Sequence, residues 1–179
     1  MHGARAQLYD LIERYGYFAE GPYTLSGGGT SNVYFDLRRI TMHPRGASVV
    51  SQLMLERLQG IDAVGGMESG AIPIAAAIAL TSGTVRAFFI RKAEKMHGRR
   101  RLAEGCLKSG DNVGIVEDVT TSGRSVLFAI KAVEQLDGTV MKVISILDRQ
   151  TGAKELIESA GYLFESLFVA SDFTNDIDF

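Results

Sequence analysis

From residue 61 to residue 169, short apolar runs alternate with segments of helical periodicity, and this alternation constrains the fold more than any other feature. The apolar runs are typical of buried strands and occupy residues 61–64, 85–90, 113–116, 140–147 and 163–169. Helices are expected between them, at residues 73–80, from about Ser122 onward, and at 153–160. The alternation predicts an α/β fold in which helices flank a central, mostly parallel sheet on both faces.

The segment before residue 61 predicts two more helices with a loop-rich region between them. Helical spacing relates two sets of apolar residues, namely Leu8, Leu11, Ile12 and Tyr15, and Val50, Leu53, Met54 and Leu58. Residues 25–32 hold three consecutive glycines and are expected to form a loop, with a strand following at 33–37. The helix at 73–80 is apolar on nearly all sides, so we expect it to be buried. With 179 residues and 46% hydrophobic content, the chain predicts one domain over residues 1–179.

The charged residues are unevenly distributed. The whole chain has 19 basic and 21 acidic residues, a net charge of −2, which makes nucleic-acid binding unlikely. Residues 91–108 nevertheless hold seven Lys or Arg against two Glu, a local charge of 7 − 2 = +5, and this favours a small anionic ligand. Cys106 is the only cysteine, and the longest apolar run, 71–80, is too short to cross a bilayer. We therefore expect a cytoplasmic protein without a membrane segment.

The stretch from Val113 to Ser125 carries the most specific chemistry. An apolar strand delivers two adjacent carboxylates, Glu117 and Asp118, to its end, and a hydroxyl-rich turn then leads into a helix. Backbone N–H groups at a helix N-terminus, with Thr and Ser hydroxyls, can cradle a phosphate. The carboxylates would then bind sugar hydroxyls or contact a divalent cation. The alternative is an ordinary junction in which Ser122 caps the helix and the acids are solvated.

A basic segment follows the strand at 85–90. Arg91, Lys92, Lys95 and His97 place cations and an imidazole within seven residues, just before the strand that leads to the acid pair. Cations that close over a pyrophosphate leaving group would stabilise its growing negative charge and exclude water. The alternative is a solvated charge run.

Two further junctions are candidates for ligand contacts. The glycine-rich turn at 65–70 allows backbone N–H groups to approach a ligand closely, although packing alone also explains such turns. Arg149 closes the strand at 140–147 and could hold a planar carboxylate through two parallel hydrogen bonds. The alternative for Arg149 is a surface ion pair with Asp148.

Together, these motifs resemble those of type I phosphoribosyltransferases, and most closely those of orotate phosphoribosyltransferases. The resemblance covers about residues 8–172 and rests mainly on the acid–hydroxyl turn at 117–125 and on the basic segment. It implies the type I phosphoribosyltransferase fold, with a small hood formed by about residues 1–40 and the C-terminal segment over the base site. It also implies transfer of the phosphoribosyl group from phosphoribosyl pyrophosphate (PRPP) to orotate. The products would be orotidine 5′-monophosphate and pyrophosphate, in pyrimidine biosynthesis.

The resemblance implies a role for each motif. Glu117, Asp118, Lys95 and His97 would be catalytic. PRPP would contact Arg91, Lys92, Lys95, His97, Glu117, Asp118, Val119, Thr120, Thr121, Ser122, Gly123, Arg124 and Ser125. The pyrophosphate loop would comprise Glu68, Ser69 and Gly70, and orotate would contact Ser26, Tyr34, Phe35, Thr121 and Arg149. Tyr34 and Phe35 could equally be core residues. Mg²⁺ would arrive with PRPP rather than in a cage built by the protein alone. A homodimer is implied because the family's basic loop reaches into the neighbouring subunit's site.

Two departures leave alternatives open. Many relatives have a Lys at the positions of Ser26 and Ser69, and this chain has no Lys or Arg from Gly21 through Leu37. The nearest alternative is therefore a phosphoribosyltransferase for another base. The second alternative is a regulator that senses PRPP without chemistry and binds RNA through Arg99 to Arg101.

Overall fold

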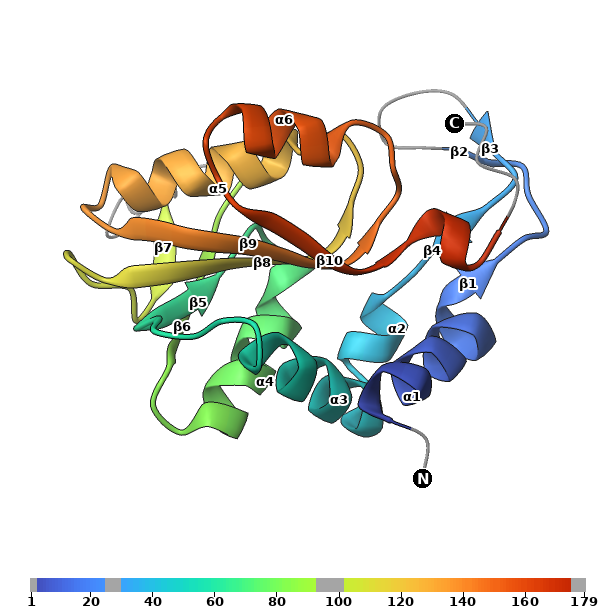
Figure 1. Ribbon diagram of the computed structural model, residues 1–179, viewed down its shortest axis with the longest axis horizontal. Helices are drawn as coiled ribbons and strands as arrows, with labels where there is room; N and C mark the ends of the chain where they lie inside the picture. Colours follow the sequence, from blue (N-terminus) through green and yellow to red (C-terminus); the bar gives the residue numbers. More distant parts are fainter. Residues whose placement is uncertain (1–2, 25–29, 93–101, 175–179) are drawn as a thin grey trace.

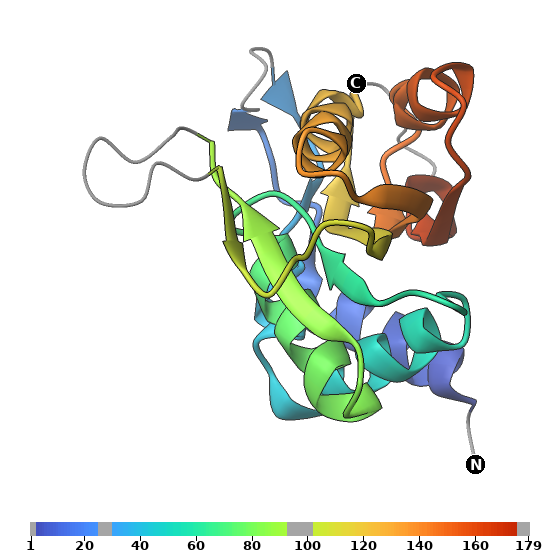
Figure 2. The same ribbon diagram turned by 90° about the vertical axis from the view of Figure 1, so that its left-hand side faces the viewer.

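The computed structural model describes residues 3–24, 30–92 and 102–174. Its centre is a six-stranded sheet with the strand order β10-β9-β8-β5-β6-β7 (Figure 1). The strands are β5 (Ala63–Gly65), β6 (Arg86–Ile90), β7 (Ala103–Gly105), β8 (Asn112–Thr120), β9 (Thr139–Asp148) and β10 (Phe164–Val169). All neighbours are parallel except β6 and β7, which lie antiparallel at one edge (Figure 2). The predicted mostly parallel sheet is confirmed.

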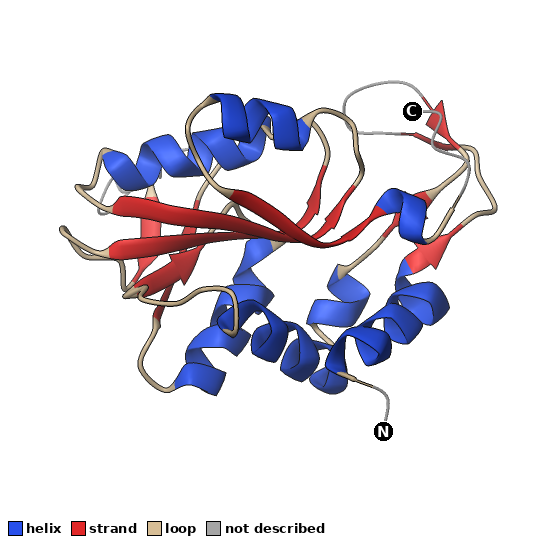
Figure 3. Cartoon of the chain, viewed as in Figure 1, coloured by secondary structure: helices blue, strands red, loops and turns tan. Residues whose placement is uncertain are grey.

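Helices cover both faces of this sheet (Figure 3). On one face lie α5 (Arg124–Glu134) and α6 (Ala153–Ser159), and on the other lie α1 (Ala4–Leu11), α3 (Pro44–Leu55) and α4 (Ala71–Ser82). Each face has its own apolar cluster. The predicted apolar face of α5, formed by Val126, Ile130 and Val133, is buried in one of them. Two helical layers around a parallel sheet place any ligand site at the carboxyl ends of the strands.

Helix α4 is less buried than its composition predicts. It packs against α3, β5 and β6 along one side, where Ile74, Ala75 and Ile78 are buried. On the opposite side Ile72 is 36% exposed and Leu80 is 86% exposed. The prediction of burial on nearly all sides is therefore wrong, because an outer helix contacts the rest of the chain on one side only.

Two strand predictions also change, and one strand was missed. β8 continues four residues beyond the predicted end, because its ladder with β9 extends through the pairs Glu117–Ser145 and Thr120–Asp148. The predicted strand at 33–37 shortens to β4 (Tyr34–Phe35), which lies outside the central sheet. β7 was not predicted, because its three residues carry no apolar alternation.

The N-terminal part forms two small two-stranded sheets outside the central one (Figure 1). β1 (Tyr17–Phe18) pairs antiparallel with β4, and β2 (Tyr23–Thr24) with β3 (Thr30–Ser31). A π-helical turn (Ile12–Gly16) extends α1, a short α2 (Arg38–Thr41) follows β4, and a 3₁₀ turn (Ala170–Asp172) follows β10. The ring of Phe173, which follows that turn, stacks on Tyr9 at 4.7 Å. The single-domain boundary stays a prediction. In the described part of the chain, no helix has the length and apolar character needed to span a membrane.

Candidate active site

A cavity of about 660 Å³ opens where β5, β6, β8 and β9 end. Segments distant in the sequence meet in its wall, which is lined by Thr24, Tyr34, Phe35, Arg38, Met67, Glu68, Gly70, Lys92, Glu117, Asp118, Val119, Thr121, Ser125 and Arg149. Carboxyl ends of neighbouring parallel strands converge in this way in α/β proteins. The cavity therefore unites the acid pair, the hydroxyl turn, the glycine-rich turn and the strand-end arginine.

The acid pair lies near the end of β8. Oε1 of Glu117 accepts the backbone N–H of Asp118 at 3.1 Å, and Oδ1 of Asp118 accepts that of Val119 at 2.8 Å. Glu117 is only 7% exposed. Burial raises the pKa of Glu117 well above its ordinary value, and the adjacent charge of Asp118 raises it further. In the ligand-free protein, Glu117 therefore keeps its proton to a higher pH than a solvated glutamate does.

The turn after the acid pair leaves the start of α5 open to an anion. Its N-cap residue is Gly123, with φ of 74°, and no side chain caps the helix there. The alternative in which Ser122 caps the helix is therefore wrong. A Cβ on Gly123 would lie 3.2 Å from Cα of Ala153, so both conformation and space favour glycine. The first N–H groups of α5 therefore have no side-chain partner at the cap, and Thr121 and Ser125 beside them line the cavity, an arrangement of donors that suits an anion.

The turn between β5 and α4 is tied to the start of the basic segment. The N–H of Glu68 donates to the carbonyl of Ile90 at 2.8 Å, and Oε1 of Glu68 accepts the N–H of Lys92 at 2.8 Å. The peptide bond between Glu68 and Ser69 is cis. These contacts hold Glu68 and Gly70 in the cavity wall, next to the point where the basic segment leaves β6.

Arg149, Tyr34 and Phe35 line another part of the cavity. Arg149 is 5% exposed, and its Nη2 donates to Oγ of Ser31 at 3.3 Å. Burial lowers the pKa of Arg149 from its ordinary value. Asp148 is itself only 4% exposed and accepts the N–H of Gln150 at 3.0 Å, so the two residues do not form the surface ion pair considered for Arg149. A buried guanidinium in a cavity wall is suited to a planar anion.

Tyr34 and Phe35 differ in their surroundings. Tyr34 is half-buried, and its ring centroid lies 5.6 Å from that of Tyr23. Phe35 is 6% exposed and packs at 5.4 Å against Tyr17 and at 5.8 Å against Phe173. Phe35 is thus a core residue with one side on the cavity, whereas Tyr34 offers more of its ring to a ligand.

Known proteins resemble this chain over nearly its whole length. No family model matches it. The orotate phosphoribosyltransferase of Rhodopseudomonas palustris (strain TIE-1) is 41% identical over 182 residues, which cover 96% of this chain and 97% of that protein. This chain belongs to the orotate phosphoribosyltransferase family.

Solved structures agree with this assignment. The orotate phosphoribosyltransferase of Mycobacterium tuberculosis H37Rv in complex with Fe(III) dicitrate has a TM-score of 0.85 and 39% identity, over 96% of this chain and 99% of that one. The same enzyme in complex with PRPP has a TM-score of 0.81 and 36% identity, with the same coverage. The type I phosphoribosyltransferase fold predicted from the motifs is confirmed.

Most of the orotate phosphoribosyltransferase motif residues named from the sequence line the cavity. These are Tyr34, Phe35, Glu68, Gly70, Lys92, Glu117, Asp118, Val119, Thr121, Ser125 and Arg149. Six others are placed outside its lining, namely Ser69, Arg91, Thr120, Ser122, Gly123 and Arg124. Ser26, Lys95 and His97 lie outside the described residues, as do Arg99 to Arg101.

Thr120 and Arg91, which lie outside the cavity lining, have different surroundings. The hydroxyl of Thr120 is buried in the sheet, where it donates toward the carbonyl of Leu147 and Oδ1 of Asp148 at 3.4 Å each. Its side chain is therefore committed to the interior. Arg91 is half-buried, and its Nε has no hydrogen-bond partner among the described residues.

Three lining residues were missed by reasoning from the sequence, namely Thr24, Arg38 and Met67. Met67 lies inside the glycine-rich turn, and its position next to Glu68 in the sequence could have indicated that it lines the cavity. Arg38 belongs to α2, and no local pattern connects it to the acid pair of β8. Among the described residues, no group of three or more His, Cys, Asp or Glu could hold a metal ion.

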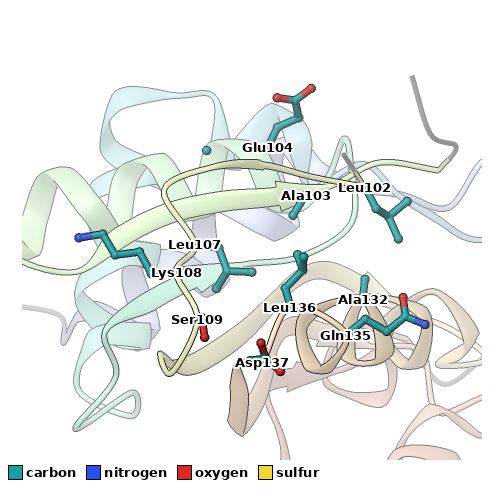
Figure 4. Close-up of a pocket in the computed structure, with 11 residues that line it drawn as sticks. Leu102, Ala103, Glu104, Leu107, Lys108, Ser109, Ala132, Gln135, Leu136 and Asp137 are labelled. Atoms are coloured by element: carbon teal, nitrogen blue, oxygen red, sulfur yellow. The ribbon is translucent and has the colours of Figure 1, made fainter. Parts of the chain in front are cut away.

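A second cavity of about 580 Å³ lies beside β7 and the C-terminal turn of α5 (Figure 4). The side chains of Leu102, Leu107 and Leu136 approach one another there, whereas Glu104 and Lys108 point outward. None of the orotate phosphoribosyltransferase motif residues lines it. This cavity is therefore separate from the candidate active site.

Proposed function

We propose that this chain transfers the 5-phosphoribosyl group of PRPP to N1 of orotate, giving orotidine 5′-monophosphate and pyrophosphate for pyrimidine synthesis. One observation carries the proposal. A single cavity brings together an acid pair, an uncapped helix N-terminus and a buried arginine, Arg149, in a member of the orotate phosphoribosyltransferase family.

PRPP would bind across the end of β8. Its 5′-phosphate would accept hydrogen bonds from the first N–H groups of α5 and from the hydroxyls of Thr121 and Ser125. Its ribose hydroxyls would donate to Glu117 and Asp118. Charge–dipole attraction at the helix N-terminus favours the phosphate at one end, and the carboxylates take the uncharged part of the ligand. The acid pair and the hydroxyl turn are adjacent along the chain, as the ribose and the 5′-phosphate are adjacent in PRPP.

Orotate would bind on the hood side. Its carboxylate matches the guanidinium of Arg149, and Tyr34 offers a ring face to the pyrimidine. N1 loses its proton to solvent and supplies the electron pair for the new bond to C1′. The bond from C1′ to the diphosphate oxygen breaks, and its electron pair leaves with pyrophosphate. Positioning and stabilisation of the leaving group would provide most of the catalysis.

Charge on the leaving group would be balanced by cations. We propose that Lys95 and His97, with Arg91 and Lys92, approach the diphosphate from the basic segment. We also propose that Mg²⁺ enters with PRPP, because the described carboxylates Glu68, Glu117 and Asp118 line one cavity without forming a metal cage. Mg²⁺ would neutralise part of the diphosphate charge and keep several water ligands.

The activity is tested by measuring PRPP-dependent pyrophosphate release with orotate, uracil, adenine and guanine, each with and without Mg²⁺. Release with orotate alone, lost after chelation of Mg²⁺, is the expected result. Catalysis with a purine and not with orotate would contradict the proposed substrate. PRPP binding without turnover on any base would support the regulator instead.

We further propose a cytoplasmic homodimer in which each basic segment serves the partner's cavity. Ile72 and Leu80 support an interface on α4, because both are exposed apolar residues on one side of that helix. The test mixes Lys95→Ala with Asp118→Asn after unfolding and refolding the two together. If half of the dimers are mixed and each has one intact site, roughly a quarter of wild-type activity should return. No recovery in mixed dimers would show that each subunit uses its own basic segment.

A further inference from the structure

Arg38 stands in the wall of the active-site cavity with no role yet assigned to it. It begins α2, at the end of the N-terminal segment expected to form the hood, and it is the first Lys or Arg after a stretch from Gly21 through Leu37 that contains neither. The cavity brings it into the same wall as Glu68, Lys92 and Asp118. The expected hood thus supplies one cation to the cavity wall, from its short helix α2.

The guanidinium of Arg38 is held in place on one side only. Its Nε donates to Oδ1 of Asp36 at 3.2 Å, and this is its only hydrogen bond within the described part of the chain. The two terminal nitrogens have no hydrogen-bond partner among the same residues. The side chain is 48% exposed. An arginine anchored through Nε presents its remaining N–H groups as a fork, which is the geometry that phosphate oxygens accept.

The charges that act on Arg38 include a member of the acid pair. The hydrogen bond and the charge of Asp36 raise the pKa of Arg38, and the charge of Asp118 adds to this effect. Glu117, the other member of the acid pair, is near a different cation. The charge of Lys92 opposes the rise in the pKa of Glu117. Each carboxylate therefore has a cation within electrostatic reach.

The distribution of charge indicates which part of the ligand Arg38 would serve. Three acids line the cavity, namely Glu68, Glu117 and Asp118, and three cations, namely Arg38, Lys92 and Arg149. Arg149 is buried beside Ser31, where the proposed function places the orotate carboxylate. Arg38 and Lys92 are then the described cations left in the cavity wall for the diphosphate. That group is attached to the same ribose as the hydroxyls that Asp118 would hold.

We propose that Arg38 binds the diphosphate of PRPP, and the pyrophosphate that leaves it, through its two terminal nitrogens. This inference rests on the proposed function and adds a diphosphate-binding residue from the hood side. Asp36 would be a positioning residue that keeps the fork turned toward the cavity. Arg38 would thereby contribute part of the positive charge that balances the diphosphate. The cations of the basic segment would add to it.

The neighbouring arginine provides a matched control. The guanidinium of Arg39 lies over the ring of Phe18 at 5.3 Å, and its side chain lines a different cavity, together with Tyr15 and His43. Arg39 has the same charge, the same helix and a similar exposure, but it does not line the active-site cavity.

The experiment measures binding of inorganic pyrophosphate and of PRPP by calorimetry, and the KM values for PRPP and orotate, in wild type, Arg38→Met and Arg39→Met. Methionine keeps an unbranched apolar stem, and the melting temperature reports folding. Arg38→Met should raise the pyrophosphate Kd and the PRPP KM by roughly tenfold or more, as expected for loss of a charge-assisted fork. The KM for orotate should stay within about twofold, and Arg39→Met should match wild type in every readout.

Unchanged pyrophosphate affinity in Arg38→Met, or an increase confined to the orotate KM, would overturn the inference. Arg38→Lys keeps the charge and loses the fork, so it should give an intermediate pyrophosphate Kd. It also provides the answer if Arg38→Met does not fold. Binding of pyrophosphate and PRPP is measured without turnover. If the wild-type protein binds pyrophosphate and PRPP but does not convert orotate, the proposed substrate is refuted. The binding measurements on the Arg38 variants would still decide the role of Arg38.

Discussion

Gly70 approaches Asp118 so closely that a Cβ at Gly70 would lie 2.5 Å from Oδ1 of that carboxylate. The same Cβ would lie 2.7 Å from Oε1 of Glu117. The turn after β5 and the end of β8 therefore meet so closely that a side chain at residue 70 would displace the two carboxylates. This contact positions the acid pair from the side, and it joins two motifs that the sequence presents separately.

Gly70→Ala should reduce activity with little loss of stability. The added methyl group meets the ends of two flexible side chains rather than backbone, so the fold can adapt by moving the carboxylates. Displacing them should lower kcat/KM for PRPP by roughly 10²-fold, as expected when a positioned group moves by about 1 Å. Gly3→Ala, where nothing lies within 4 Å of the added Cβ, is the control. Wild-type kinetics in Gly70→Ala would show that the acid pair tolerates displacement.

Glu117→Gln should stabilise the ligand-free protein at neutral pH while impairing turnover. The pKa of Glu117 is raised by burial and by Asp118, so the folded state binds a proton that the unfolded state releases. The stability that this bound proton contributes is fully present below the ordinary glutamate pKa and is lost as pH rises through the raised pKa. Glutamine carries no such charge. Melting temperature against pH should show a gain for the variant that vanishes toward acid pH.

Glu165→Gln provides a control of opposite sign. Burial acts to raise the pKa of Glu165, but hydrogen bonds from Lys142 at 2.5 Å and Arg57 at 2.8 Å outweigh it, and the pKa is lowered. The stability that these partners contribute is present above the ordinary glutamate pKa and disappears as pH falls through the lowered one. Glu165→Gln should therefore melt below wild type at neutral pH. Parallel pH curves for the two variants would contradict both assignments.

Phe173→Ala tests whether the C-terminal segment supports the hood. The Phe173 ring stacks on Tyr9 at 4.7 Å and meets Phe35 edge-on at 5.8 Å. Removing this partly buried ring should cost about 1–3 kcal/mol of the free energy of unfolding. Because Phe35 also lines the cavity, the KM for orotate should rise. Chemical denaturation gives the first quantity, and Leu163→Ala, at a 69% exposed site, should leave both unchanged.

Arg149→Lys should weaken orotate without weakening PRPP. Lysine keeps the positive charge but cannot form two parallel hydrogen bonds with a carboxylate. The KM for orotate should rise by roughly tenfold or more, whereas the PRPP KM should stay within about twofold. Steady-state kinetics with each substrate varied in turn separates the two, and Arg45→Lys at an exposed position is the control. An increase in the PRPP KM alone would show that Arg149 binds PRPP and not orotate.

Local patterns predicted the layers and the chemistry of the main motifs. The alternation of strands and helices was enough for the parallel sheet, because buried strands and outer helices differ in apolar periodicity over a few residues. The turn at 117–125 was readable for the same reason, since a phosphate cradle uses consecutive residues. Features without such a pattern were missed, such as the antiparallel edge strand β7 and the exposed side of α4.

By itself, the sequence determined the fold class, the family motifs and the identity of the acid pair, because each is encoded in neighbouring residues. Only the tertiary structure decided that Gly70 touches Asp118, that Glu68 ties its turn to Lys92, and that Arg38 joins the cavity. These contacts depend on the order of β8, β5 and β6 in the sheet and on where α2 packs against the rest of the chain. That arrangement arises from burying two apolar faces at once, a long-range constraint that no short stretch of residues carries.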